Sequence, residues 1–149
     1  MKIFIICTVR NATPEYLKKL ENYVGELNAK GHTVHFPPRD TKQEDETGGY
    51  VICRTNMQGI LWADEVHVSY NEKSTGTHFD LGMAFMSNKK IHVFDCPEID
   101  ESIPKSFPKM MRHWEKTNKM YKFNPSDEWY EKASEEEDSL PDFSIGERF

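Results

Sequence analysis

Asp80 is the residue of this sequence whose type and position most clearly suggest chemistry. It lies in the run Phe79-Asp80-Leu81-Gly82, among side chains that are expected to face a sheet. A carboxylate there needs a partner or a function, because burying an uncompensated charge is costly. The alternative is a solvated Asp in the first turn of a helix, where the helix dipole favours an acidic residue. If it is buried, Asp80 is a candidate catalytic carboxylate.

The segment just before Asp80 is suited to binding an anion. Ser74, Gly76 and Thr77 lie where a predicted helix begins, so hydroxyl groups and free backbone amides would face the same space. Arg10, in the loop after the first predicted strand, could add a bidentate contact to a phosphate or a carboxylate. The alternative is that the hydroxyl groups only cap the helix, which is the commoner role of Ser and Thr at this position.

Other polar residues follow predicted strands and are therefore expected at one edge of a parallel sheet, where ligands bind in open α/β folds. They are Cys7 and Thr8 at the end of the first strand, Arg39 and Asp40 after the second, Tyr70 after the third and Asp95 after the fourth. Cys7 is more typical of a small core residue than of a nucleophile, because no His partner is evident. Arg39 and Asp40 could cover a bound base, although a local salt-linked turn explains them equally well.

Hydrophobic periodicity predicts the elements that position these residues. The expected strands are residues 2–9, 32–36, 65–69 and 90–94, the expected helices are residues 14–30, 50–63, 76–88 and 107–118, and residues 39–49 are expected to form a long loop. Because strands and helices alternate, we expect a single Rossmann-like, flavodoxin-like α/β domain with a doubly wound parallel sheet. Trp62 and Phe85 are expected in its core.

Composition excludes several classes of protein. The 149 residues are 37% hydrophobic and 30% charged, which is typical of one soluble globular domain. No apolar run reaches the ~20 residues that span a bilayer, and no signal-peptide cleavage pattern follows the first residues, so a cytoplasmic location is expected. Three widely spaced Cys predict neither a disulfide framework nor a metal site.

Charge divides the chain into two parts. Residues 125–149 carry a net charge of −7 and are expected to form an acidic arm, whereas residues 1–124 form the domain. The domain is nearly neutral and lacks the basic stripe that binding to a nucleic-acid polymer requires. A small molecule is therefore the expected partner.

Three segments together resemble the nucleoside 2-deoxyribosyltransferase superfamily, including its branch that hydrolyses deoxynucleoside 5′-monophosphates. Residues 74–82 (STGTHFDLG) look like the family's Ser-x-Gly-x-x-aromatic-Glu-Leu-Gly segment, with Asp80 in place of the catalytic Glu. Residues 6–10 (ICTVR) are similar to the strand segment that holds the 5′-phosphate, which implies this role for Arg10 and Ser74. Residues 56–66 (NMQGILWADEV) resemble a family helix that begins with an active-site Asp, replaced here by Asn56.

The resemblance implies an enzyme that cleaves the N-glycosidic bond of a nucleoside or a nucleoside 5′-monophosphate, as a homodimer or larger homo-oligomer and without a cofactor. Asp80 would act at the anomeric carbon, and because Asp is shorter than Glu by ~1.5 Å, hydrolysis is favoured over transfer. Asn56 would orient a sugar hydroxyl or the base. Any acid would come from Asp40 or Asp64, although Asp64 is more typical of a brace for the third strand. The competing interpretation is a nucleotide-binding module that has lost the carboxylate chemistry.

Overall fold

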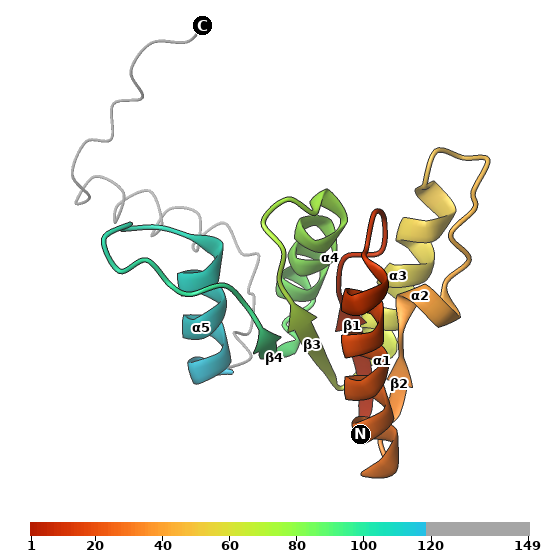
Figure 1. Ribbon diagram of the computed structural model, residues 1–149, viewed down its shortest axis with the longest axis horizontal. Helices are drawn as coiled ribbons and strands as arrows, with labels where there is room; N and C mark the ends of the chain where they lie inside the picture. The colour runs from red at the N-terminus through yellow and green to blue at the C-terminus, as the bar shows by residue number, and fades with distance from the viewer. Residues whose placement is uncertain (119–149) are drawn as a thin grey trace, which may run out of the picture.

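A four-stranded parallel sheet forms the centre of the computed structural model, which describes residues 1–118 (Figure 1). The strands are β1 (Lys2–Ile6), β2 (Thr33–His35), β3 (Glu65–Ser69) and β4 (Lys90–Asp95), in the order β2-β1-β3-β4. Neighbouring strands are parallel in every pair, which confirms the predicted α/β class. The predicted acidic arm, residues 125–149, and the last residues of the predicted domain lie outside the described residues.

Five helices accompany the sheet within residues 1–118: α1 (Pro14–Ala29), α2 (Pro37–Asp40), α3 (Tyr50–Trp62), α4 (Thr75–Met86) and α5 (Phe107–Thr117). α1 begins as predicted, because Thr13 Oγ1 accepts a hydrogen bond from the Tyr16 amide and Pro14 takes the first helical position. The pattern predicts no helix after β2, but two prolines suited to a helix start allow the short α2 there. None of these helices is long and apolar enough to cross a membrane.

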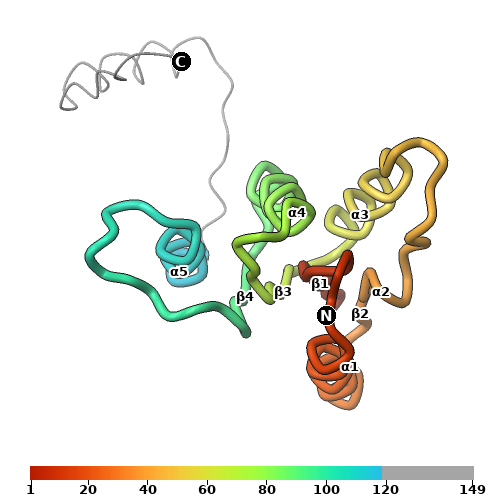
Figure 2. Tube along the Cα trace, turned by 45° about the horizontal axis from the view of Figure 1, so that its top comes forward, coloured from red at the N-terminus to blue at the C-terminus, as the bar shows by residue number. Residues whose placement is uncertain are grey.

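α1 covers one face of the sheet, whereas α3 and α4 cover the other and α5 packs beside β4 (Figure 2). The side chains of β1 alternate between the two cores. Phe4 and Ile6 belong to the core under α3 and α4, and Ile3 and Ile5 belong to the core under α1. β1 is therefore the central strand that its unbroken apolar run predicts, covered on both faces.

The close approach of α3 to β1 depends on Gly59. A Cβ at this position would lie 2.7 Å from the Phe4 ring, nearer than real Cβ atoms come to their neighbours. The Phe4 ring is fully buried and stacks on His35 with 5.0 Å between the ring centroids, so it has little room to move. Gly59 thus brings Asn56, one turn earlier in α3, close to the sheet and to α4.

Side chains of α5 and of its C-cap residue, Asn118, close the outer edge of β4. The Asn118 side chain accepts a hydrogen bond from the Ile91 amide at 2.9 Å and donates one to the Ile91 carbonyl at 3.4 Å. Glu115 accepts from the Val93 amide at 2.8 Å, and Arg112 donates to the Val93 carbonyl at 3.1 Å. These bonds satisfy backbone groups that an edge strand otherwise leaves open to another chain.

The large apolar side chains of α3 and α4 are less buried than the sequence predicts. Trp62 and Phe85, both expected in the core, are 38% and 61% exposed. A different face of α4 packs on the sheet. Its buried residues recur at helical spacing and are Thr77, Asp80, Leu81 and Ala84. The prediction for Trp62 and Phe85 is wrong because the tight packing of both helices on the sheet accommodates small and polar side chains there, not the largest ones.

Candidate active site

Asp80 lies on the sheet-facing side of α4, one turn after this helix begins at the carboxyl edge of the sheet. It is 6% exposed, so the solvated alternative does not apply. Asn56 of α3 donates a hydrogen bond from Nδ2 to Asp80 Oδ2 at 3.1 Å, with Oδ1 at 3.5 Å. Asn56 is itself 9% exposed. The structure thus brings together the two residues that the sequence nominates as catalytic.

Burial changes the acid–base behaviour of the groups around Asp80. It raises the pKa of Asp80 from 3.8 to about 7, although the hydrogen bond from Asn56 acts in the opposite direction. Burial and the nearby Asp80 charge raise the pKa of Cys7 to about 12. The Cys7 thiol is therefore protonated at neutral pH and belongs to the core, as expected. Asp80 changes its charge near neutral pH, which is a property of many catalytic carboxyl groups.

Ser74 is the N-cap of α4. Capping is the role that the sequence pattern gives as the alternative to binding an anion. Ser74 Oγ accepts hydrogen bonds from the Thr77 amide at 3.3 Å and from the Thr77 hydroxyl at 2.9 Å. Thr77 is fully buried and serves this cap. Gly76 is exposed, and a Cβ added there would meet no atom within 4 Å. In the first turn of α4, Gly76 is therefore accessible to a ligand, whereas the Thr77 side chain is enclosed by the protein.

The segment after β1 contains a buried hydroxyl without a partner and an exposed cation. Thr8 is 8% exposed, and among buried side-chain polar atoms of residues 1–118 its Oγ1 alone has no hydrogen-bond partner. The Thr8 amide donates to the Tyr16 hydroxyl at 3.3 Å. Arg10 is exposed on the turn that follows. Arg10 is thus available to a ligand at the carboxyl edge, whereas Thr8 Oγ1 is closed off from solvent.

Arg39 and Asp40 form a local salt-linked turn. Arg39 donates to both carboxylate oxygens of Asp40, at 2.6 Å and 2.7 Å, and the Phe36 amide donates to the same carboxylate at 2.7 Å. Burial alone would raise the pKa of Asp40, but these hydrogen bonds hold it below its ordinary value. Asp40 is therefore ionised at neutral pH and unsuited to donate a proton, and the Arg39 guanidinium is already engaged.

Asp64 lies at the opposite edge of the sheet from Asp80. Its Oδ2 accepts a hydrogen bond from the Lys2 amide at 2.8 Å, and its own amide donates to the Lys2 carbonyl at 2.8 Å. These two bonds join the start of β1 to the start of β3. Asp64 is the brace that the sequence suggests, and its place at the amino edge removes it as an acid for Asp80.

Tyr70 is tied to α4 through His78, a residue that the sequence pattern does not single out. His78 Nδ1 lies 2.8 Å from the Ser74 carbonyl oxygen and must donate to it, because a carbonyl only accepts. In the neutral ring, Nε2 then accepts from the Tyr70 hydroxyl at 3.1 Å. Phe107 contacts His78 edge-on, with 4.7 Å between the centroids. The Tyr70 hydroxyl is thus engaged within the protein.

Two enzymes are among the solved structures that are similar to this chain. The 2-deoxyribosyltransferase of Bacillus psychrosaccharolyticus matches with a TM-score of 0.56 and 21% identity, over 83% of this chain and 100% of that chain. The CMP N-glycosidase of Clostridium botulinum matches with a TM-score of 0.52 and 16% identity, over 89% of this chain and 97% of that chain. This chain has the fold of these two enzymes. No protein-family model matches it, and no curated protein matches its sequence.

A chain of hydrogen bonds from α1 to β4 crosses the carboxyl edge of the sheet. Most of its members are not predicted by the sequence pattern. The Tyr16 hydroxyl donates to Ser69 Oγ at 2.9 Å, and the Ser69 hydroxyl donates to Asp95 Oδ2 at 2.8 Å. Lys19 pairs with the other Asp95 oxygen at 2.8 Å. Asp95 could be found, because it follows the predicted strand 90–94 and is the last residue of β4. Its partners could not, because their contacts depend on how α1 packs across β3.

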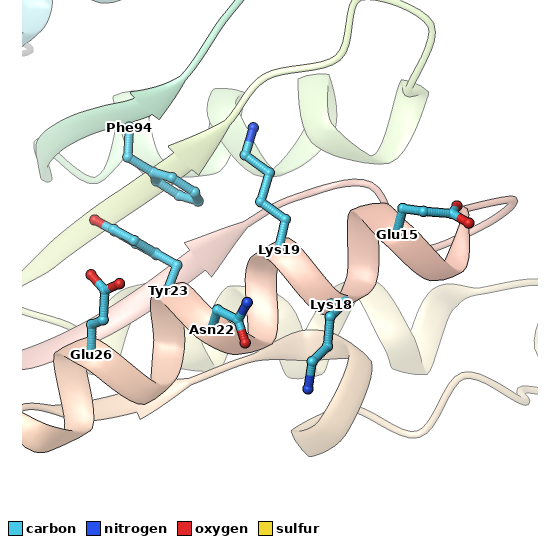
Figure 3. A pocket seen from close by; sticks show the side chains of 7 residues that line it. All are labelled: Glu15, Lys18, Lys19, Asn22, Tyr23, Glu26 and Phe94. Carbon is cyan, nitrogen blue, oxygen red and sulfur yellow. The ribbon is translucent and has the colours of Figure 1, made fainter.

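A cavity of about 650 Å³ opens on the α1 side of the sheet (Figure 3). It is lined by Glu15, Lys18, Lys19, Asn22, Tyr23, Glu26 and Phe94. The rings of Tyr23 and Phe94 stack with 3.8 Å between their centroids. Because α4 covers the other face, the sheet separates this cavity from Asp80. In the part of the chain that the structure describes, no group of three or more His, Cys, Asp or Glu side chains could hold a metal ion.

Proposed function

We propose that this protein cleaves the N-glycosidic bond of a nucleoside or a nucleoside 5′-monophosphate, with hydrolysis as the favoured outcome. The observation that carries the proposal is the buried Asp80 carboxylate at the carboxyl edge of the sheet, which accepts a hydrogen bond from Asn56 and has its pKa raised by burial to about 7. The fold supports it, because a 2-deoxyribosyltransferase and a CMP N-glycosidase share it.

The ionised Asp80 carboxylate has two possible roles at the anomeric carbon. It can attack this carbon, so that a glycosyl ester forms while the C–N bond breaks and the base leaves with the bonding electrons; water then hydrolyses the ester. It can instead accept a proton from a water molecule that attacks this carbon, while the C–N bond breaks and the base leaves with the bonding electrons. The shorter side chain of Asp favours the second role, which leaves room for the water. In both, Asn56 holds the carboxylate in place.

A 5′-phosphate would bind between the start of α4 and the loop after β1. The free amides of a helix start favour an anion. Ser74 Oγ accepts both bonds of the cap, so its own hydroxyl proton is not needed there. Arg10, exposed in the loop after β1, supplies the positive charge. These residues define a phosphate subsite as part of the proposal.

The experiment that tests this function incubates the full chain with ribo- and deoxynucleosides and their 5′-monophosphates and measures free base by chromatography. We expect base release from at least one of them. The rate should rise with pH through about 7, because Asp80 acts in its ionised form. Binding without base release from any of these compounds would instead support a nucleotide-binding module.

Arg10→Ala is expected to remove the preference for a phosphorylated ligand. A charge-assisted hydrogen bond contributes roughly 1.5 to 3 kcal/mol, so the affinity for the preferred monophosphate should fall roughly tenfold to a hundredfold, whereas that for the nucleoside stays unchanged. Calorimetry measures both affinities. The control is Lys30→Ala, which removes an exposed cation where α1 ends, at the other edge of the sheet. Equal affinities of the wild type for both ligands would show a nucleoside site without a phosphate subsite.

The proposal includes a homo-oligomer, as the resemblance implies. α3 and α4 expose the apolar side chains of Val51, Leu61, Phe79 and Met86, by 52% to 76%. An interface between copies that covered them would remove this apolar area from water.

A further inference from the structure

Asp80 is the last member of a chain of hydrogen bonds that joins four parts of the fold and is buried from Thr41 to Asp80. His35 Nε2 of β2 lies 3.0 Å from Thr41 Oγ1, just after α2. The Thr41 hydroxyl donates to Asn56 Oδ1 at 3.1 Å, and Asn56 Nδ2 donates to Asp80 at 3.1 Å. Thr41 is 4% exposed. Neither Thr41 nor His35 has a place in the proposed function described above.

When Asp80 is ionised, the chemistry of the four groups permits one direction of donation through this chain. An ionised Asp80 only accepts, so Asn56 must turn its N–H groups towards it. The Asn56 carbonyl oxygen then faces Thr41 and receives the single hydroxyl proton. The Thr41 oxygen can therefore only accept from His35, which requires a proton on Nε2. Both the neutral ring with this proton and the imidazolium satisfy that requirement.

We propose that Thr41, oriented by His35, is a positioning residue that keeps the N–H groups of Asn56, and not its carbonyl oxygen, towards the Asp80 carboxylate. Without the Thr41 hydroxyl, only the charge of Asp80 itself favours this orientation of the amide, and a protonated Asp80, which can donate as well as accept, is compatible with both orientations. In the reversed orientation two oxygens face each other, which opposes ionisation of Asp80. Thr41 thus acts on the charge of Asp80 without touching it.

The other titratable groups near this chain do not determine the orientation of the Asn56 amide. Cys7 of β1 is the titratable neighbour that interacts with Asp80, and it stays protonated because its pKa is raised to about 12. His35 faces Asp40 and Arg39, which neutralise each other in the salt-linked turn. Burial lowers the pKa of His35, so the ring is neutral where Asp80 titrates. The Asn56 amide remains the polar partner whose orientation can vary.

The test is Thr41→Val, which keeps the shape of the side chain and removes the hydroxyl. The ionisation midpoint of Asp80 is followed by carbon NMR of its carboxyl group in the full chain and is assigned with Asp80→Asn. We expect the midpoint to rise by roughly one pH unit, which corresponds to the loss of one charge-assisted hydrogen bond. Thr41→Ser retains the hydroxyl and is expected to keep the wild-type midpoint.

The inference rests on the proposed function only for its catalytic consequence, and the NMR titration needs no activity. If the enzyme releases base, Thr41→Val should lower kcat several-fold near neutral pH, with recovery at higher pH and little change in KM. An unchanged midpoint with equal loss at every pH would show that Thr41 is only structural. If Thr41→Val does not fold, His35→Phe keeps a ring against Phe4 and removes the donor; it should raise the midpoint, and no rise would overturn the proposal.

Discussion

Asp80→Asn is expected to abolish base release while ligand affinity changes little. The substitution keeps the shape of the side chain and removes the charge that would stabilise an oxocarbenium-like sugar or activate water. A group that acts mainly in the transition state contributes to kcat more than to binding. We therefore expect kcat to fall by at least about a thousandfold. Chromatography of the free base measures the rate, and calorimetry measures the affinity.

Two further variants define what this result means. Asp64→Asn removes a carboxylate at the opposite edge of the sheet and should leave kcat unchanged. Asp80→Glu extends the carboxylate by ~1.5 Å and should increase transfer relative to hydrolysis when a second base is present. If the wild type releases base and Asp80→Asn retains that rate, Asp80 is not the catalytic carboxylate.

Asp80→Asn is also expected to stabilise the protein at neutral and alkaline pH. Burial raises the pKa of Asp80 in the folded state from 3.8 to about 7. Between these two values the folded state keeps a proton that the unfolded state releases, so the free energy of unfolding of the wild type falls as pH rises. Above about 7 the loss is complete and on the order of a few kcal/mol. Asn cannot ionise and avoids this loss.

Denaturant unfolding of both proteins over a range of pH measures the effect. The free-energy difference should be small near pH 4, grow in favour of Asp80→Asn up to about pH 7, and then stay constant. His67, whose pKa burial lowers to about 4, destabilises both proteins equally as pH falls, so its contribution cancels. A difference independent of pH would mean that Asp80 ionises with an ordinary pKa. A gain in stability together with a loss of rate is the expected signature of a functional carboxylate.

The sheet and its main helices could be predicted because their signals are local. The apolar run of β1, the cap at Thr13 and the Ser74 segment before α4 each specify structure within a few residues. α2 is harder to predict, since a helix of four residues shows little hydrophobic periodicity. The burial of Trp62 and Phe85 was predicted wrongly, because the rotation of a helix about its axis is decided by the surface on which it packs.

The sequence by itself determined that Asp80 follows β3 in a doubly wound sheet, and therefore that a carboxylate lies at the carboxyl edge with Arg10 and Ser74 in the neighbouring loops. Only the tertiary structure decided its chemistry. The pKa of Asp80 depends on its burial between α4 and the sheet, and its hydrogen bond depends on Asn56, which Gly59 brings close by letting α3 approach Phe4. These contacts join residues far apart in the chain, and their strength comes from exclusion of water, which no local pattern records.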